Sequence, residues 1–326
     1  MGIFGALYGG IGQGLLWAML GIGVYLTFRI LDFPDLTAEG TIALGCAVTM
    51  NLINLGVSPI VATLAAVICG VLAGLSTGLL HTKLGIPAIL SGILTMIALY
   101  SINIRIMGGS TSLSIAASDS MIAPIKGKLI NAGMERSLST STSTVIIGLL
   151  ACVFVIALLY WFFGTEMGAA MRATGDNEKM CRALGVNTDA AKIVTLCISN
   201  AIIALSGALV SQQMAYGGVY VGVGAIVIGL AAIILGESFI GKKSPFYMRL
   251  IFIALGSVIY YLIITLIIFY GILRPTDTKF ITAAMVIIAI SIPKIKKALP
   301  QNKPAVRKTS GPVQPATSFR MMGQEG

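Results

Sequence analysis

Nine apolar runs, most of them long enough to cross a membrane, constrain this chain more than any other feature. A transmembrane helix needs about 20 mostly apolar residues. The runs lie near 5–28, 40–56, 59–80, 86–106, 144–164, 190–213, 222–240, 247–270 and 279–293. With 56% of the 326 residues hydrophobic and 10% charged, a soluble fold could not cover this apolar surface. We therefore predict an all-α, polytopic integral membrane protein of about nine transmembrane helices; the second and ninth runs are short, so eight or ten remain open.

The distribution of positive charge predicts the orientation of these spans. If the polar segment 165–191 is cytoplasmic and the nine spans alternate, 16 of the 22 lysines and arginines face the cytoplasm. This bias has the sign that membrane insertion produces, and it places the N-terminus outside and the C-terminus inside. The cations lie between apolar runs and in the tail, without a folded basic face, so the net charge of +10 does not indicate nucleic-acid binding.

Segment 165–191 is polar but patterned for structure. Helix formers over 166–173 end at Gly175, and Asp176 or Asn177 can cap a short second helix over 178–184. Gly185 follows that helix where a left-handed residue is needed, and Thr188 and Asp189 can cap the next span. The short helix has an apolar stripe of Met180, Ala183 and Leu184 opposite Lys179 and Arg182. A simple linker needs none of these features, so we predict that another protein grips the segment.

The remaining polar segments lie outside the spans. Residues 107–143 form one long external loop, in which 114–125 and 128–135 could be short helices. Residues 299–326 have no periodicity and are predicted to be a disordered cytoplasmic tail. The domain organisation is thus one transmembrane domain, 1–298, followed by that tail.

The acidic residues Asp32, Asp35 and Glu39 lie next to the second span. Carboxylates at membrane depth are costly, so burial would indicate an ion or substrate contact or a proton relay. A cytoplasmic turn around Pro34, with Asp35 or Thr37 capping the second span, is the interpretation we favour. The segment 29–41 could instead dip into the bilayer as a broken element.

Small and hydroxylated residues mark two further spans. Gly70, Gly74 and Gly78 give the third span a smooth face for close helix packing. Ser91 and Thr95, one turn apart on the fourth span, could line a polar path, although hydroxyl bonds to their own helix are at least as plausible.

No set of residues predicts catalysis or a metal or cofactor site. The segment 236–244 nearly matches a phosphate-binding loop, but Lys243 occupies the place where the hydroxyl residue must follow the lysine. The single histidine and five cysteines lack the spacing of a metal site, a disulfide framework or a catalytic triad.

The polar segment also carries a motif, G-x-x-x-R-A-x-G-x-N-x-x-x-[AC]-x-x-x-G-[IV]-N. It resembles the cytoplasmic loop of permease subunits in the branched-chain amino acid and ribose group of ABC importers. The motif residues are Gly168, Arg172, Ala173, Gly175, Asn177, Cys181, Gly185, Val186 and Asn187. The segments 84–87, 92–95 and 229–236 resemble the same group, and 32–40 is closest to its tryptophan/tyrosine permeases. Cys181 stands where alanine is commoner, and Glu237 where a second glycine is common.

The resemblance implies a type II-like importer permease fold and a transport subunit that has no ATPase site of its own. It implies two permeases, expected as a homodimer in the cytoplasmic membrane, with two separate ATP-binding subunits beneath them. A substrate-binding protein, lipid-anchored in a Gram-positive cell or periplasmic in a Gram-negative one, would dock outside on 107–143. The solute would be small: an aromatic amino acid first and a branched-chain one next, with sugars and nucleosides left open. The ATPase-coupling residues would be those of the motif, together with Asp176, Glu178 and Arg182. A separate set could border the translocation path: Asp35, Glu39, Ser91 and Thr95.

The main alternative is an ion-coupled secondary transporter that uses Asp32, Asp35 and Glu39. Such a transporter often has an internal repeat, and the chain shows no convincing one. An intramembrane enzyme lacks a nucleophile and base, and a purely structural protein would not need the patterned loop.

Overall fold

The computed structural model describes residues 2–240, 244–271, 277, 280–284, 286, 287 and 291. Within them, seven helices are long and apolar enough to cross a membrane, which confirms the all-α polytopic class. The long helices are α1 (Ile3–Tyr25, continued by the π-helical η1, Leu26–Ile30), α2 (Thr37–Asn54), α3 (Pro59–Thr82), α4 (Ala88–Ile106), α6 (Arg136–Phe163), α9 (Thr188–Met214), α10 (Ala225–Ser238) and α11 (Phe246–Phe269). About half of the predicted ninth span and all of the tail 299–326 lie outside the described residues, and the count of nine is not confirmed.

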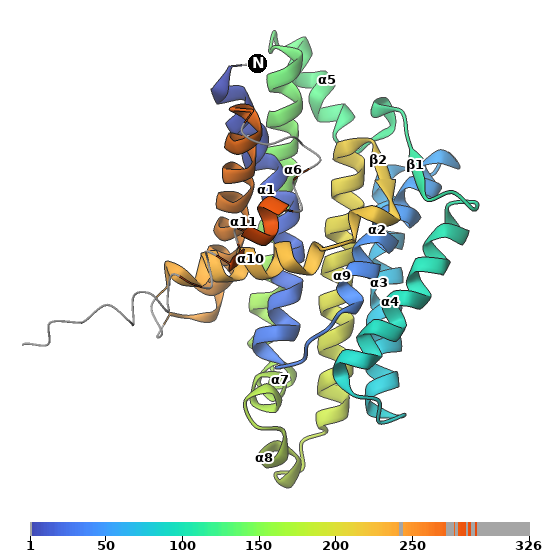
Figure 1. Ribbon diagram of the computed structural model, residues 1–326, viewed down its shortest axis with the longest axis vertical. Coiled ribbons are helices and arrows are strands. Elements are labelled where there is room, and N and C mark those ends of the chain that lie inside the picture. Colours follow the sequence, from blue (N-terminus) through green and yellow to red (C-terminus); the bar gives the residue numbers. More distant parts are fainter. Residues whose placement is uncertain are drawn as a thin grey trace, which may run out of the picture.

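Helix α1 lies at the centre of the bundle. In the most apolar stretch of α1 with its continuation to Ile30, 78% of the residues are buried. The corresponding share is 28% in α4 and 28% in α6. It packs against α6, α9, α10 and α11 (Figure 1). The outer helices expose large apolar side chains such as Leu149, Phe154 and Ile97. Such a surface suits lipid or a partner chain, because water would not stabilise it.

The glycine face of the third span is confirmed as a packing surface. A Cβ on Gly74 would lie 2.3 Å from the Leu196 carbonyl oxygen, and one on Gly70 would lie 2.5 Å from that of Asn200. Both contacts are with α9 backbone, so α3 and α9 approach closely only because these residues lack side chains. This approach fixes the position of α9, whose midpoint carries Asn200.

Two elements depart from the parallel arrangement of the long helices. Residues 31–36 turn back from the lower end of α1 into the bundle, and α2 begins there and runs toward the outer end (Figure 1). Helix α10 lies across the bundle rather than along it, with its first residues beside α2 (Figure 1). The interpretation of 32–35 as a solvent-exposed cytoplasmic turn is wrong, because Phe33 and Asp35 are buried, although Asp35 does accept from the Thr37 N–H at the start of α2. The broken segment left open for 29–41 is what the structure shows.

Short helices and strands close one end of the bundle. At the end that holds the N-terminus lie β1 (Ser112–Ser114), η2 (Ala117–Asp119), α5 (Ala123–Asn131), and β2 (Tyr216–Gly218), followed by η3 (Val219–Val221) (Figure 1). Strands β1 and β2 pair antiparallel. The predicted helices over 114–125 and 128–135 are wrong in their bounds, because α5 bridges both ranges. Helix α6 begins eight residues before the predicted span, and the hydroxyls of Thr140, Thr142 and Ser143 in that polar first part bond to carbonyls of the same helix.

Candidate functional site

The loop at the opposite end contains α7 (Glu166–Asp176) and α8 (Glu178–Ala183) (Figure 1). Thr165 caps α7 by accepting from the Gly168 N–H at 3.4 Å, and Arg172 donates to the Phe163 carbonyl at 3.0 Å. A Cβ on Gly168 would lie 2.4 Å from Phe163 Cα. Helix α7 is therefore held tightly against the end of α6, as a rigid transmitting element would need to be.

The capping predicted for the short helix is confirmed. Asn177 Oδ1 accepts from the Met180 N–H at 3.0 Å, and Gly185 has a φ of +82° just beyond the helix. Cys181 is buried, whereas Met180 and Leu184 are 51% and 73% exposed. The predicted apolar stripe thus faces away from the protein. Exposed apolar side chains on a capped helix at one end of a membrane bundle indicate a contact surface.

Ionic contacts tie α8 to α9. Arg182 Nη2 lies 3.1 Å from Glu178 Oε1 and 3.2 Å from Asp189 Oδ1, and Lys192 Nζ lies 2.8 Å from the same Glu178 oxygen. Thr188 Oγ1 accepts from Arg182, so the predicted caps of α9, Thr188 and Asp189, serve this cluster instead. The cap of α9 is Asn187, which accepts from the Ala190 N–H at 3.0 Å.

Glu178 gives the loop a pH dependence. The hydrogen bond from Lys192, with the charges of Lys192 and Arg182, lowers the pKa of Glu178 below its usual range. A lowered pKa means that this stabilisation is present above the unfolded-state pKa of about 4.3 and is lost as the pH falls through the folded-state value. We expect Glu178→Gln to lower the free energy of unfolding at pH 7 by less than about 1 kcal/mol, because the carboxylate is partly exposed. The melting temperature should fall accordingly.

Melting curves of the detergent-purified protein at pH 7 and pH 3.5 would check this expectation. The difference between Glu178→Gln and the unmodified chain should shrink at the lower pH, while Asp176→Asn, an exposed change on the same loop, should have little effect at either. An equal difference at both pH values would contradict the assignment.

The second polar cluster lies in the middle of the bundle. Asp35 is 1% exposed; its Oδ1 accepts from the Thr37 N–H at 2.9 Å and its Oδ2 from Asn200 Nδ2 at 2.8 Å. Thr41 donates to Asn200 Oδ1 at 2.6 Å. Thr37 and Thr77 share a hydrogen bond of 2.7 Å. This network joins the start of α2 to α3 and α9, and it satisfies polar groups that would otherwise be costly in a low-dielectric interior.

The other predicted path residues separate into different environments. Ser91 and Thr95 bond to their own helix through the carbonyls of Ala88 and Ser91, the alternative that the sequence made at least as plausible as a polar path. Thr95 also accepts from Thr77, so it extends the buried network. Asp32 is exposed and has a φ of +53°. The acidic residues therefore do not form one cluster.

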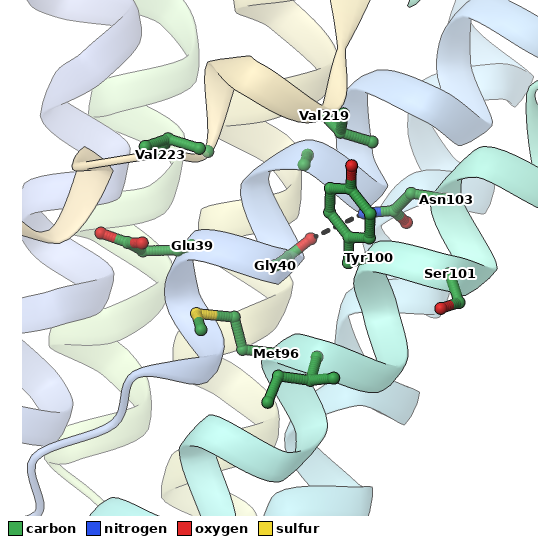
Figure 2. A pocket seen from close by; sticks show the side chains of 11 residues that line it. Glu39, Gly40, Met96, Tyr100, Ser101, Asn103, Val219 and Val223 are labelled. Atoms are coloured by element: carbon green, nitrogen blue, oxygen red, sulfur yellow. Dashed lines mark hydrogen bonds between the residues drawn. The ribbon is translucent and has the colours of Figure 1, made fainter. Parts of the chain in front are cut away.

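Glu39 lines a pocket of about 310 Å³ between α2, α4 and η3 (Figure 2). Its Oε1 accepts from the N–H of Gly224, just before α10, at 3.0 Å. Asn103 of α4 lines the same pocket and donates from Nδ2 to the Gly40 carbonyl at 3.2 Å (Figure 2). Ser91 and Thr95 are not among the lining residues.

Sequence reasoning missed Asn200, Thr77 and Asn103. Each is a polar residue inside an apolar run, and that is the signal that could have drawn attention to them. Among the residues that the structure describes, no group of three or more His, Cys, Asp or Glu side chains could hold a metal ion.

Comparisons with known proteins place the chain in a family. The model of the branched-chain amino acid transport system / permease component matches residues 6–290. A tyrosine transport system permease protein of Clostridioides difficile (strain R20291) is 39% identical over 197 residues, 60% of this chain and 61% of the relative. The autoinducer 2 import system permease protein LsrC of Escherichia coli (strain K12 / DH10B) is 30% identical over 196 residues, 60% of this chain and 52% of that protein.

A solved structure is similar over most of the chain, at low identity. PsaBC from Streptococcus pneumoniae, in complex with Fab, has 15% sequence identity and a TM-score of 0.47, over 89% of this chain and 91% of that one. The match to the C. difficile relative spans less than two thirds of that protein's length. The family model, by contrast, covers nearly all of the described residues. The chain therefore belongs to the family of permease components of branched-chain amino acid transport systems, the ABC importer permeases that the loop motif predicted.

Proposed function

We propose that this protein is the transmembrane subunit of a binding-protein-dependent ABC importer and that 165–191 couples it to a separate ATPase. The observation that carries the proposal is the exposed stripe of Met180 and Leu184 on a helix capped at both ends. A capped helix resists fraying, so force applied to the stripe moves α8 as a unit. The ion pairs of Lys192 with Glu178 and of Asp189 with Arg182 pass that movement to α9.

The same geometry suggests how the coupling reaches the bundle centre. Helix α9 carries Asn200, which holds Asp35 at the start of α2. In addition, a Cβ on Gly175 would lie 1.8 Å from the Ile30 carbonyl oxygen, so α7 lies directly against the lower end of α1. ATP-driven closure beneath the loop would thus displace both α9 and the broken segment 31–36. Rigid-body movement of packed helices is a common form of such switching.

The proposed solute is an amino acid, and an aromatic one is favoured. The support is the similarity to a protein described as a tyrosine transport system permease, together with the resemblance of 32–40 to aromatic amino acid permeases. We further propose a homodimer in the cytoplasmic membrane with the C-terminus inside. An external substrate-binding protein, a lipoprotein in a Gram-positive cell, would deliver the solute to the surface around α5 and β1.

The proposal is tested by cross-linking in the protein's own membranes. A Leu184→Cys variant should form a cross-link with an ATP-binding subunit, identified by mass spectrometry, and that subunit should co-purify in near-equal amount. The matched control is Leu150→Cys, an exposed position in the middle of α6. A homo-oligomer with no ATPase cross-link at Leu184 would contradict the coupling role and favour the ion-coupled alternative.

Gly185→Val provides a functional test of the cap. Valine strongly resists a φ of +82°, so we expect the end of α8 to unwind and solute uptake to be lost while the protein still folds. Uptake of labelled tyrosine into cells or proteoliposomes measures the effect, and Gly185→Asn, which tolerates this conformation better, should retain more activity. Normal uptake by the valine variant would count heavily against the capped-helix model.

A further inference from the structure

We propose that His81 is a positioning residue that connects α8 of the coupling loop 165–191 to α3 and to the broken segment 31–36, and that a second proton on its ring breaks this connection. The inference rests on the import function proposed above and concerns the regulation of that same loop. His81 lies in the last turn of α3, at the end of the bundle that carries α8 (Figure 1). It is the only histidine of the chain.

The ring of His81 is held at both of its nitrogens. Its Nδ1 lies 2.8 Å from the carbonyl oxygen of Ile86, and its Nε2 lies 3.3 Å from Lys192 Nζ. A carbonyl oxygen only accepts, so Nδ1 carries the proton. An ammonium group only donates, so Nε2 keeps its lone pair. The two contacts therefore select one neutral tautomer of the ring, and both contacts depend on it.

Lys192 of α9 connects this ring to the coupling loop. Its Nζ lies 2.8 Å from Glu178 Oε1, and its side chain is 13% exposed. An ammonium group has three donors, so it can serve the ring nitrogen and the carboxylate at the same time. A chain of hydrogen bonds thus runs from α3 through Lys192 to α8. The pair of Arg182 with Asp189, by contrast, connects α8 to α9 alone.

The ring also contacts the broken segment. Phe33 is 3% exposed and packs against His81 in a T-shaped arrangement, with the ring centroids 5.1 Å apart and the planes at 81°. Aromatic rings in this arrangement attract each other. One turn earlier on α3, Thr77 shares its hydrogen bond with Thr37, just beyond the segment. Helix α3 therefore holds the broken segment at two successive turns, and His81 forms the contact nearer the coupling loop.

The backbones around His81 leave little room for adjustment. A Cβ on Gly78 would lie 3.1 Å from Ile193 Cα, so α3 and α9 touch about one turn from His81 and beside Lys192. A second ring proton would place an N–H on Nε2, so two donors and two positive charges would face each other. Because the helices cannot separate here, the Lys192 side chain must turn away from the ring. Helix α8 then loses its connection to α3.

Other charged side chains lie on the elements around the ring, but of those that the structure describes only Lys192 is hydrogen-bonded to it. A histidine changes its charge between about pH 5 and pH 8. The lowered pKa of Glu178 keeps that carboxylate charged over the same range. The connection is therefore made at neutral pH and broken on acidification. The other charged groups are Glu178 and Arg182 on α8, Asp189 on α9, Lys83 just beyond α3, Asp32 beside Phe33, and Arg105 at the far end of α4.

The state of the ring can be measured in the purified chain without an ATPase. Because the chain has one histidine, labelling with ¹⁵N-histidine gives one pair of ring nitrogen signals in a nuclear magnetic resonance spectrum. The chain would carry a histidine-free affinity tag and lie in lipid nanodiscs. We expect the Nδ1–H tautomer at about pH 8, where the ring is neutral. A ring that is mostly Nε2–H would overturn the inference, because it could not accept from Lys192.

Two amide variants separate the two contacts of the ring. His81→Gln places an amide oxygen near the position of Nε2, so it can accept from Lys192 but cannot titrate. His81→Asn places an amide N–H near the position of Nδ1, so it keeps only the contact with Ile86. The complex with the ATP-binding subunit would be reconstituted in proteoliposomes, and the pH would be varied on the side of the coupling loop. The measured quantity is the number of labelled tyrosine molecules taken up per ATP hydrolysed, which corrects for the pH dependence of the ATPase.

In the unmodified complex we expect this ratio to fall about threefold from about pH 8 to about pH 5.5, a change of the size expected for one hydrogen bond. It should be low at both pH values in His81→Asn, and retained and nearly independent of pH in His81→Gln. The matched control is Thr82→Val, which should follow the unmodified complex, because the Thr82 hydroxyl bonds to the Gly78 carbonyl of its own helix. Equal ratios in the two histidine variants would overturn the inference. So would a His81→Gln variant with the pH dependence of the unmodified complex.

Failure of the inference is separable from failure of the proposed function. Absence of the ATPase cross-link at Leu184 would reject the importer, while the ring signals would still report the contact of His81 with Lys192. A cross-link at Leu184 and normal uptake, together with equal ratios in the two histidine variants, would reject only the role of His81. If a variant does not fold, the tautomer in the unmodified chain still tests the contact.

Discussion

Gly175→Ala is expected to abolish ATP-driven uptake, because it separates the coupling loop from the centre of the bundle. The added Cβ would lie 1.8 Å from the Ile30 carbonyl oxygen and 3.0 Å from Leu31 Cα. Both are backbone atoms, so no side-chain rotation can relieve the overlap and α7 must shift. Overpacking of this kind costs about 1–3 kcal/mol and is accompanied by backbone displacement.

The expected outcome is an uncoupled transporter rather than an unfolded one. Helix α7 is still capped by Thr165 and α8 by Asn177 in this variant, so the ATP-binding subunit should still bind. Uptake of labelled tyrosine measures transport. ATP hydrolysis by the assembled complex measures the activity of the ATP-binding subunit separately. Gly5→Ala is the matched control, since a Cβ there meets nothing within 4 Å and should leave uptake unchanged. Full uptake by the Gly175→Ala variant would show that the contact of α7 with Ile30 is not needed for coupling.

Asp35→Leu is expected to destabilise the whole bundle. The change leaves the Thr37 N–H and Asn200 Nδ2 without their carboxylate acceptor in a fully buried position. Each buried group that loses its partner costs about 1–3 kcal/mol. We therefore expect a lower melting temperature in detergent and reduced amounts in the membrane, although leucine adds apolar bulk.

Two variants separate the structural role of Asp35 from a role in proton transfer. Asp35→Asn retains an oxygen that can accept from Thr37 or Asn200, so it should lose less stability than leucine does. Asp32→Asn removes an exposed carboxylate three residues away and should be nearly neutral, because asparagine tolerates the φ of +53°. Unchanged stability of Asp35→Leu would contradict the network. Normal stability of Asp35→Asn with loss of proton-dependent uptake would favour the ion-coupled alternative.

The coupling loop was the part of the site most readable from sequence. Caps and left-handed glycines depend on interactions within a few residues, so Asn177 and Gly185 could be assigned from their neighbours alone. The caps of α9 were misassigned by one and two positions. Thr188 and Asp189 have suitable oxygens, but Arg182 binds both, and Asn187 caps the helix instead. Local chemistry alone could not decide that competition.

The interior of the site could not be predicted in the same way. Pro34 between two aspartates is typical of a solvent-exposed turn, and nothing nearby in the sequence signals that Asp35 meets Asn200, 165 residues later. The pocket is a stronger case, because Glu39 precedes one apolar run and Asn103 lies within another, and both line the pocket only because α2 packs on α4. Contacts between distant segments depend on packing, which hydropathy does not report.

The sequence by itself determined the membrane class, the approximate spans, the glycine packing face of α3 and the capped loop helix. Each of these depends on a property that repeats or acts over a few residues: apolar length, small-residue spacing or a cap. Only the tertiary structure decided that α2 begins inside the bundle, that Asp35 is buried, and that Asn103 and Glu39 line the same pocket. The physical reason is that a membrane span is specified by its own composition, whereas a buried polar group is satisfied by whichever distant helix packs against it.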